Sequence, residues 1–332
     1  MIERRRLGRT GLDVTRIGVG LAAIGRPGYI TLGRAADLPG ERTHDAMYAR
    51  VAAVLDAARA AGVRYVDVAR SYGDAETFLA RWLRERGITR AELVVGSKWG
   101  YRYTAGWCTD APVHEQKELS GERFTTQLAE SRGLLGSWLD LYAIHSATVE
   151  SGCLADARLL AALVAGRRRG DYRAIGFTLS GPTSIATLEQ GLAARVDGER
   201  VFDVVQATFN VLEPSLAAAL AGAYDAGVGV IAKEVFANGR LSDANVRPGD
   251  ATLLARLRAV APDVPLDRLA LAFVLAHPFV DVALSGAATV DQLRSHVDAT
   301  VAPHPPDLRS TLAAFAEAPA DYWATRARLP WN

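Results

Sequence analysis

The chain has little of several features that would point to a specialised environment or partner. Only two residues are cysteine, Cys108 and Cys153, and neither has the spacing of a metal-ligand or redox motif, so we expect both to be reduced thiols. The formal net charge is only +1, which gives a nucleic-acid or acidic-membrane partner no electrostatic support. Charges or His277-Pro278 interrupt the longest apolar runs, so none is expected to cross a bilayer.

Two further features are missing. Residues 1–8 are rich in charge and lack the hydrophobic region of a signal peptide, which predicts a cytoplasmic protein. The six histidines are scattered, with no His-x-His at a predicted strand end. This weakens the alternative of a metal-dependent barrel hydrolase, and we expect no metal site. What the chain has in quantity is hydrophobic residues, 49% of its 332 positions, enough for a large core.

Short apolar runs alternate with amphipathic helices along the chain. Residues 4–7 and 13–17 flank Gly8-Arg9-Thr10-Gly11, a pattern that predicts a β-hairpin before the main fold. Eight strands are predicted at 17–21, 63–67, 93–98, 139–145, 172–177, 202–207, 228–232 and 280–284, and helices are predicted to begin near Thr43, Ala75, Glu122, Leu154, Thr183, Ser215, Leu266 and Thr289. Eight strand–helix pairs predict an α/β fold, a (β/α)8 TIM barrel that takes in residues 1–332 as a single domain.

A doubly wound open sheet with an appended domain is the alternative fold. That fold needs a glycine-rich turn that leads from the first strand directly into a helix. Residues 18–23, Gly-Val-Gly-Leu-Ala-Ala, hold two of the three glycines, and no helix follows at once. The dinucleotide-binding fingerprint is therefore incomplete, which favours the barrel.

Long connections are predicted at one face of the barrel. Residues 22–42, 99–121 and 233–250 follow the first, third and seventh strands, and a tail starts at Val301. Connections of this length are typical of lids or binding walls. The second connection and the tail contain many aromatic residues, which either pack against the rim or surround a substrate: Trp99, Tyr101, Tyr103, Trp107, Tyr322, Trp323 and Trp331.

Polar residues follow three consecutive predicted strands. Asp67 ends the second strand and Tyr72 stands in the turn after it, while Lys98 ends the third strand and His145 the fourth. The C-terminal ends of parallel strands meet at one face of a barrel, so these side chains are expected together. Singly, each has an ordinary role, such as a surface lysine or a buried histidine. Jointly, they predict a proton-donating site.

With these residues the chain resembles the aldo-keto reductase family, whose Asp, Tyr, Lys and His tetrad follows strands two, three and four. The resemblance covers nearly the whole chain and consists of six landmarks in family order: Arg6-Leu-Gly-Arg-Thr-Gly, Asp67-Val-Ala-Arg-Ser-Tyr72-Gly, Ser97-Lys98-Trp-Gly, Asp140-Leu-Tyr-Ala-Ile-His145, Gln206 with Asn210, and Gly286-Ala287 followed by Gln292. It implies an NAD(P)H-dependent oxidoreductase that reduces an aldehyde, ketone or sugar-like carbonyl by hydride transfer.

The resemblance gives each tetrad residue a role. Tyr72 would act as the general acid that protonates the carbonyl oxygen. A free tyrosine has a pKa near 10, so Lys98 is expected to lower the pKa of Tyr72. Asp67 would hold Lys98 by an ion pair, and His145 would orient the substrate oxygen. Trp99 and Tyr101 are the expected residues of the substrate pocket.

Cofactor residues also follow from the resemblance. Gln206 matches a glutamine that binds the carboxamide, and Gly20 lies near the end of the first predicted strand, beside the expected site. Gly286 and Ala287 lead from the last strand into a helix, where backbone N–H groups can hold a phosphate.

Several cofactor positions depart from the family pattern. Thr178 stands where the family usually has a serine, and its neighbour Leu179 cannot hydrogen-bond, so Ser180 is the expected substitute. Lys233 replaces an aromatic residue that stacks on the nicotinamide in many members. His296 replaces an asparagine near the adenine.

NADPH is the expected cofactor, with NADH as the alternative. Gln292 stands where some members have arginine, but Arg240 and Arg294 are expected to reach the 2′-phosphate, which suits a guanidinium group. The expected partner is a small-molecule carbonyl compound, with no nucleic acid and no membrane. A nucleotide-binding regulatory subunit that reports redox state with little turnover is the alternative function.

Overall fold

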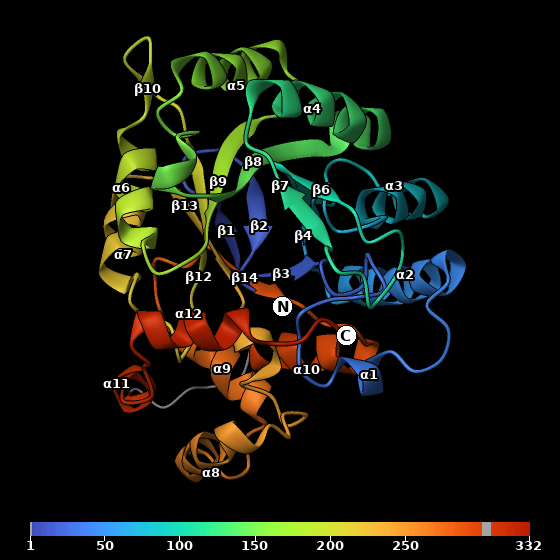
Figure 1. The fold of residues 1–332 in the computed structure, drawn as a ribbon, viewed down its shortest axis with the longest axis vertical. Coiled ribbons are helices and arrows are strands. Elements are labelled where there is room, and N and C mark those ends of the chain that lie inside the picture. The colour runs from blue at the N-terminus through green and yellow to red at the C-terminus, as the bar shows by residue number, and fades with distance from the viewer. Residues whose placement is uncertain (1, 301–306) are drawn as a thin grey trace.

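The computed structural model describes residues 2–300 and 307–332. Eight parallel strands close into a barrel in the order β12-β13-β14-β3-β4-β5-β8-β9, so the predicted (β/α)8 fold is confirmed (Figure 1). Each barrel strand overlaps one of the eight predicted runs. In chain order they are β3 (Ile17–Gly20), β4 (Tyr65–Asp67), β5 (Val94–Trp99), β8 (Leu139–Ala147), β9 (Ala174–Leu179), β12 (Val204–Thr208), β13 (Gly229–Lys233) and β14 (Val282–Ser285).

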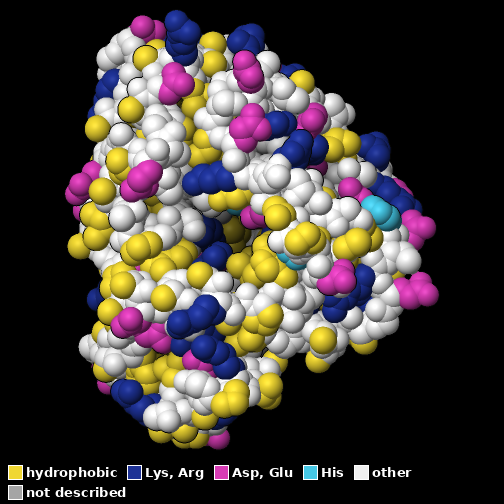
Figure 2. All heavy atoms as spheres, in the orientation of Figure 1, with side chains coloured by type: hydrophobic (Ala, Val, Ile, Leu, Met, Phe, Trp, Pro, Cys, Tyr) yellow, Lys and Arg dark blue, Asp and Glu magenta, His cyan; other side chains and the backbone are white. Residues whose placement is uncertain are grey.

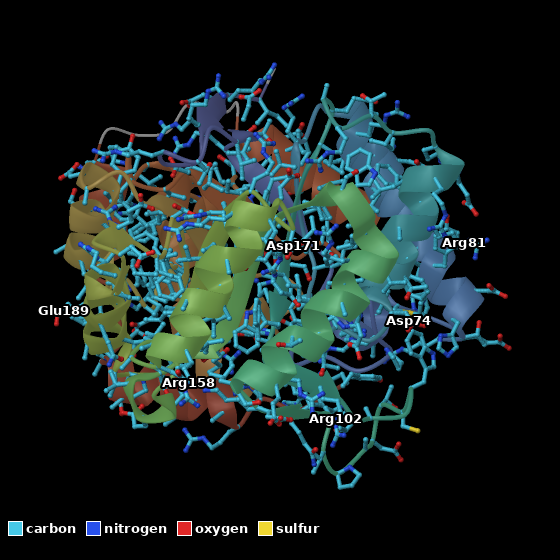
Figure 3. All side chains as sticks on the ribbon, turned by 90° about the horizontal axis from the view of Figure 1, so that it is seen from above. Asp74, Arg81, Arg102, Arg158, Asp171 and Glu189 are labelled. Carbon is cyan, nitrogen blue, oxygen red and sulfur yellow. The ribbon has the colours of Figure 1, made fainter. Side chains whose placement is uncertain are left out.

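Helices follow the strands in turn and cover the outside of the barrel. They are α2 (His44–Ala60), α3 (Ala75–Glu85), α4 (Gly121–Leu135), α5 (Ala157–Arg169), α6 (Ser184–Ala193), α7 (Ala217–Asp225), α9 (Leu266–Leu275) and α10 (Val290–Ala299). Thr43 caps α2 by accepting a hydrogen bond from the Ala46 N–H. Charged side chains such as Arg81, Arg158 and Glu189 point outward from α3, α5 and α6 (Figure 3).

Some elements had no clear signal in the sequence. They are the antiparallel pair β6 (Tyr101–Tyr103) and β7 (Glu115–Lys117), the pair β10 (Arg195–Val196) and β11 (Glu199–Arg200), the helices α1 (Arg34–Asp37), α8 (Ala251–Val260), α11 (Leu308–Ala313) and α12 (Pro319–Ala327), and 3₁₀ turns at Gly136–Trp138, Val149–Ser151, Ala237–Gly239 and Pro248–Asp250. The predicted start of the tail, at Val301, lies outside the described residues. No helix among those described is long and apolar enough to span a membrane.

The predicted N-terminal hairpin is confirmed as β1 (Arg4–Arg6) paired with β2 (Asp13–Thr15). The Arg9 N–H donates to the carbonyl of Gly227, and Leu7 and Leu12 are fully buried in a cluster with barrel residues. Gly8 has a φ of +50°, and a Cβ there would lie 2.3 Å from the nitrogen of Gly229, so only glycine fits. The hairpin therefore closes the N-terminal end of the barrel and leaves the opposite end for chemistry.

The C-terminal segment crosses the open end of the barrel. Figure 1 shows α12 in front of the strands, with β6 and β7 on another side of the same opening. Tyr29 and Asn332 exchange two backbone hydrogen bonds of 3.1 Å, which ties the end of the chain to the first long connection. A space-filling view shows a hollow at the centre of this face, edged by basic and hydrophobic side chains (Figure 2).

Candidate active site

The barrel mouth holds a cavity of about 390 Å³, lined by residues from strand ends, the long connections and the C-terminal segment. Asp67 is the last residue of β4, and Tyr72 lies in the turn between β4 and α3. Both line the cavity, as does His145 of β8, while Lys98 of β5 lies buried beneath them. The four side chains expected together from the sequence therefore converge at one site.

A buried ion pair forms the floor of the site. The Lys98 ammonium donates hydrogen bonds to Asp67 and to the carbonyl of Val68, and both charged side chains are almost completely buried. The second oxygen of Asp67 accepts from the Gln206 amide at 2.9 Å and from the Tyr65 hydroxyl at 3.2 Å. Both charges are thus paired and hydrogen-bonded, which holds Lys98 in one position.

Tyr72 stands beside this pair as a neutral phenol. The Lys98 ammonium lies 4.7 Å from the centre of the Tyr72 ring. Burial and the negative charge of Asp67 raise the pKa of Tyr72 well above its usual value of 10, and Arg26 only partly opposes them. This direction is opposite to the lowering expected from Lys98. The reason is that Asp67 offsets the lysine charge at hydrogen-bond distance, so that burial dominates.

His145 stands between two phenol rings. Its ring makes edge contacts with Tyr72 at 5.5 Å and with Tyr101 at 4.9 Å between centroids. Burial, with the charges of Lys98 and Lys233, lowers the pKa of His145 well below 6.5. The imidazole is therefore neutral at physiological pH, with one donor and one acceptor nitrogen.

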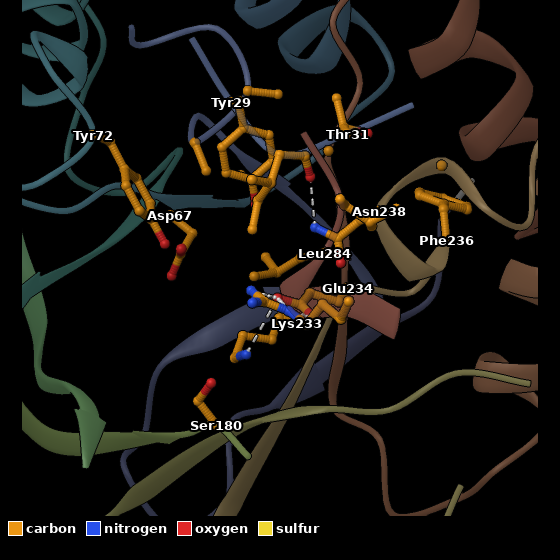
Figure 4. Close-up of a pocket in the computed structure, with 18 of the residues that line it drawn as sticks. Tyr29, Thr31, Asp67, Tyr72, Ser180, Lys233, Glu234, Phe236, Asn238 and Leu284 are labelled. Atoms are coloured by element: carbon orange, nitrogen blue, oxygen red, sulfur yellow. Dashed lines mark hydrogen bonds and ion pairs between the residues drawn. The ribbon is translucent and has the colours of Figure 1, made fainter. Parts of the chain in front are cut away.

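A second charged group lies across the cavity, at the end of β13. Figure 4 shows Lys233 and Glu234 on the side opposite Tyr72 and Asp67. The Lys233 ammonium donates to the Thr208 hydroxyl at 2.8 Å, and burial lowers the pKa of Lys233 to about 8.

Glu234 is held by a residue that the sequence did not signal. The Arg326 Nε of α12 donates to both Glu234 oxygens, at 3.0 and 2.9 Å. Burial opposes ionisation of Glu234, but the charges of Arg326 and Lys233 outweigh it and lower the pKa of Glu234 to about 2. Because no pattern predicts α12, only the fold shows that the C-terminal segment brings a cation into the cavity.

The remaining wall comes from loops. Arg26, only 2% exposed, donates to the Glu115 carboxylate and to the carbonyl of Ser71, each at 2.8 Å. Its guanidinium carbon lies 5.3 Å from the Tyr29 ring centre and 4.8 Å from that of Trp331. Sequence reasoning missed Arg26, Tyr29 and Glu115, because their only signal was the length of the connections that carry them.

Some expected cofactor residues lie at the cavity. Gly20, Gln206, Lys233 and Gly286 line it, and so does Ser180, the expected substitute for Thr178. A Cβ on Gly286 would meet no atom within 4 Å. Nothing in the chain therefore requires a glycine there, and the open space can admit a ligand close to the start of α10. These residues fit a nicotinamide dinucleotide.

Other expected cofactor residues are engaged within the fold. The Thr178 hydroxyl is buried and accepts from the Ser146 N–H at 2.7 Å. The Ala287 N–H donates to the Ser285 hydroxyl at 3.3 Å. Gln292 uses its amide oxygen to accept from the Ala288 N–H at 2.8 Å, so it caps the first turn of α10.

The expected role of Arg240 is wrong. This guanidinium is 4% exposed and donates to Asp250 and Glu317 through all three nitrogens, with distances of 2.7 to 3.3 Å. It therefore cannot meet a phosphate without breaking buried ion pairs. Arg294, in contrast, carries a side chain that is 71% exposed and contacts Asp291 at 3.3 Å.

Of the aromatic residues in the long connections and the tail, some surround the cavity and others pack against the barrel rim. Tyr101 and Trp331 line the cavity, as a substrate wall requires. Trp99 does not, and its predicted place in the substrate pocket is wrong. It is fully buried, and its ring centre lies 5.2 Å from that of Phe124. Consecutive strand residues face opposite sides, and because Lys98 faces the inside of the barrel, Trp99 faces the outside. Trp107 stacks on His44, with ring centres 3.8 Å apart, and packs against the rim of the barrel.

The remaining candidate ligand residues are the histidines, the cysteines and the acidic side chains. Across residues 2–300 and 307–332, no cluster of three or more His, Cys, Asp or Glu side chains is arranged to hold a metal ion. Cys108 is exposed and Cys153 is buried, and both are free thiols. His296, expected near the adenine, is buried and stacks on Phe236 with ring centres 4.2 Å apart.

Comparison with known proteins gives a consistent result. A model described as "Aldo/keto reductase family" matches residues 18–315. Protein tas of Escherichia coli (strain K12) is 28% identical over 295 residues, a match that covers 74% of this chain and 83% of that protein. D-threo-aldose 1-dehydrogenase of Pseudomonas sp is 28% identical over 293 residues, covering 79% of this chain and 86% of that protein. The holo form of aldo-keto reductase AKR11C1 from Bacillus halodurans has the same fold, with a TM-score of 0.76 at 22% identity over 96% of this chain and 97% of that one. The chain therefore belongs to the aldo/keto reductase family.

Proposed function

We propose that this protein is an NAD(P)H-dependent oxidoreductase that reduces an aldehyde, ketone or sugar-like carbonyl, with Tyr72 as the general acid. The observation that carries the proposal is the convergence of Asp67, Tyr72, Lys98 and His145 at one cavity in the barrel mouth. The name of the Pseudomonas relative, an aldose dehydrogenase, supports a sugar-like substrate. We also propose that the protein is located in the cytoplasm.

The residues of the chain supply the proton and the polar environment. A carbonyl oxygen that gains negative charge needs a donor beside it, and Tyr72 is a neutral phenol that still holds its proton. The buried Lys98 ammonium, 4.7 Å from the ring centre, stabilises the phenolate once the proton has left. Asp67 keeps that ammonium in place, and neutral His145 orients the substrate oxygen by a hydrogen bond.

A nicotinamide cofactor, when bound, supplies the hydride. Gly20, Ser180, Gln206 and Gly286 are the cavity residues proposed to hold it. NADPH is proposed over NADH, and the support now comes from Arg294 alone of the two expected arginines. Its contact with Asp291 joins two exposed side chains, and such a pair is weak enough for the guanidinium to turn toward a phosphate.

A screen of carbonyl compounds with NADPH and with NADH tests this function, with oxidation of the nucleotide as the readout. Turnover of a simple aldehyde that is lost in Tyr72→Phe supports the enzyme. Tight nucleotide binding without turnover of any carbonyl compound contradicts it and favours the regulatory subunit.

A further inference from the structure

The Arg26–Glu115 ion pair in the cavity wall leaves part of its hydrogen-bonding capacity unused. Arg26 engages only Nη1 in hydrogen bonds within the described chain, so its Nη2 group has no partner there. Glu115 accepts through Oε2, and its side chain is 23% exposed and lines the cavity. The Arg26 Nη2 group and the second Glu115 oxygen are therefore left to form hydrogen bonds with a ligand in the cavity.

The pair is held rigidly close to the proposed acid. The guanidinium carbon of Arg26 lies 5.4 Å from the Tyr72 ring centre. Trp331 covers the same guanidinium at 4.8 Å and is itself stacked on His114, with ring centres 4.0 Å apart. A guanidinium fixed by an aromatic face and a carboxylate is preorganised for recognition. Because Arg26 and Tyr72 line the same cavity, a substrate whose carbonyl oxygen meets Tyr72 can present its neighbouring carbons to Arg26.

We infer that Arg26 and Glu115 are specificity-determining residues that recognise neighbouring hydroxyl groups of a neutral, polyhydroxylated carbonyl compound. The inference rests on the proposed function and names its substrate class. A hydroxyl group both donates and accepts, so one hydroxyl can accept from Arg26 while the next donates to Glu115. Neither residue alone has both capacities.

The carboxylate argues against an anionic substrate. A ligand carboxylate would meet the negative charge of Glu115 and would compete with it for Arg26. The other two cations that line the cavity are also paired, since Lys233 and Arg326 both contact Glu234. The aromatic side chains of Tyr29 and Trp331 also line the cavity and add apolar surface that suits the C–H groups of a sugar.

The test compares three substrate classes in four proteins. The substrates are a panel of aldopentoses and aldohexoses of both hands, butanal, which has no hydroxyl group, and D-glucuronate, which adds a carboxylate. The proteins are the wild type, Arg26→Met, Glu115→Gln and the control Arg102→Met, whose side chain is exposed on β6 outside the cavity. Glu115→Gln keeps the side-chain volume and provides a second variant should Arg26→Met fold poorly.

Both cavity variants should lower kcat/KM for the best aldose by roughly tenfold or more, mainly through KM. Turnover of butanal should fall by a much smaller factor than turnover of the aldose, and Glu115→Gln should reduce the preference for the aldose over D-glucuronate. Equal losses for butanal and the aldose, or a wild-type preference for D-glucuronate, would overturn the inference.

A binding measurement separates this inference from the proposed function. Titration calorimetry with the alditol of the best-binding aldose needs neither cofactor nor turnover. Wild-type binding that weakens roughly tenfold in both cavity variants, but not in Arg102→Met, supports the pair even if no carbonyl is reduced. Wild-type protein that reduces butanal but binds no aldose or alditol contradicts the pair and leaves the oxidoreductase in place.

Discussion

The Lys98 ammonium lies 4.7 Å from the centre of the Tyr72 ring while it donates a hydrogen bond to Asp67. The lysine charge is therefore balanced before any substrate arrives, and the phenol keeps its proton. This arrangement suits a general acid, because the ammonium is in place to stabilise the phenolate as the proton moves to the substrate.

Lys98→Met should reduce kcat strongly, by an amount comparable to the roughly 10²–10⁴-fold loss of a general acid. The variant removes the charge beside Tyr72 but keeps the length of the side chain. The measurement is the pH–rate profile, with circular dichroism to confirm the fold, because Asp67 loses its counter-ion. An unchanged profile with near-normal kcat would show that Lys98 has no part in proton transfer.

Lys233 should make nucleotide affinity pH-dependent near pH 8. The pKa of Lys233 is lowered to about 8 by burial, so the free protein loses this positive charge as pH rises through 8. An anionic nucleotide should then bind more weakly at pH 9 than at pH 7, and Lys233→Met should remove that difference. Fluorescence titration across this range is the measurement. Thr208→Val, which removes the hydroxyl that Lys233 contacts, should keep the pH dependence.

Arg294→Ala should weaken NADPH binding by about 1.5–3 kcal/mol, as expected for lost hydrogen bonds to a charged group, and should leave NADH nearly unchanged. Dissociation constants for both nucleotides are the measurement. Equal effects on the two, or a wild-type preference for NADH, would show that Arg294 does not meet the 2′-phosphate.

Arg240→Ala should behave differently, because Arg240 is committed to ion pairs. Its removal leaves Asp250 buried with only the more distant Arg247, at 3.4 Å, as a counter-ion, and breaking a buried ion pair destabilises a fold by up to about 3–5 kcal/mol. Chemical unfolding should show this loss, with the NADPH to NADH preference of the folded variant unchanged. A variant of normal stability with reduced NADPH affinity would instead support a contact between Arg240 and the 2′-phosphate.

Glu234 should make the free energy of unfolding fall in acid. Its pKa is lowered from 4.5 to about 2, so the native state binds fewer protons than the unfolded state between these values. The contribution is complete above pH 4.5 and is lost as pH falls toward 2, and amounts to about 3 kcal/mol. Glu234→Gln should remove this pH dependence from unfolding curves measured between pH 5 and pH 2. Glu189→Gln, on the exposed surface of α6, is the control.

The barrel and the floor of the site were readable from the sequence because they depend on local patterns. Each barrel strand is a short apolar run bounded by turns, and Asp67, Lys98 and His145 stand at strand ends, where the fold itself brings them together. Eight short strands of this kind, with helices between them, leave little choice of arrangement.

The walls were not readable, because they depend on contacts between distant loops. Arg26 meets Glu115 across 89 positions and Arg326 meets Glu234 across 92, and no local pattern specifies either meeting. The prediction for Arg240 was wrong for a similar reason, since one of its two partners, Glu317, lies 77 positions away. The prediction that Trp99 lines the substrate pocket was wrong because side chains alternate along β5, which turns Trp99 away from the cavity.

Tyr72→Phe tests the central claim most directly, because it removes the hydroxyl proton and keeps the ring. The measurement is kcat for the best carbonyl substrate, together with the dissociation constant of NADPH. The account predicts that kcat falls by at least roughly 10²–10⁴-fold while nucleotide binding persists. Near-normal turnover by Tyr72→Phe would contradict it.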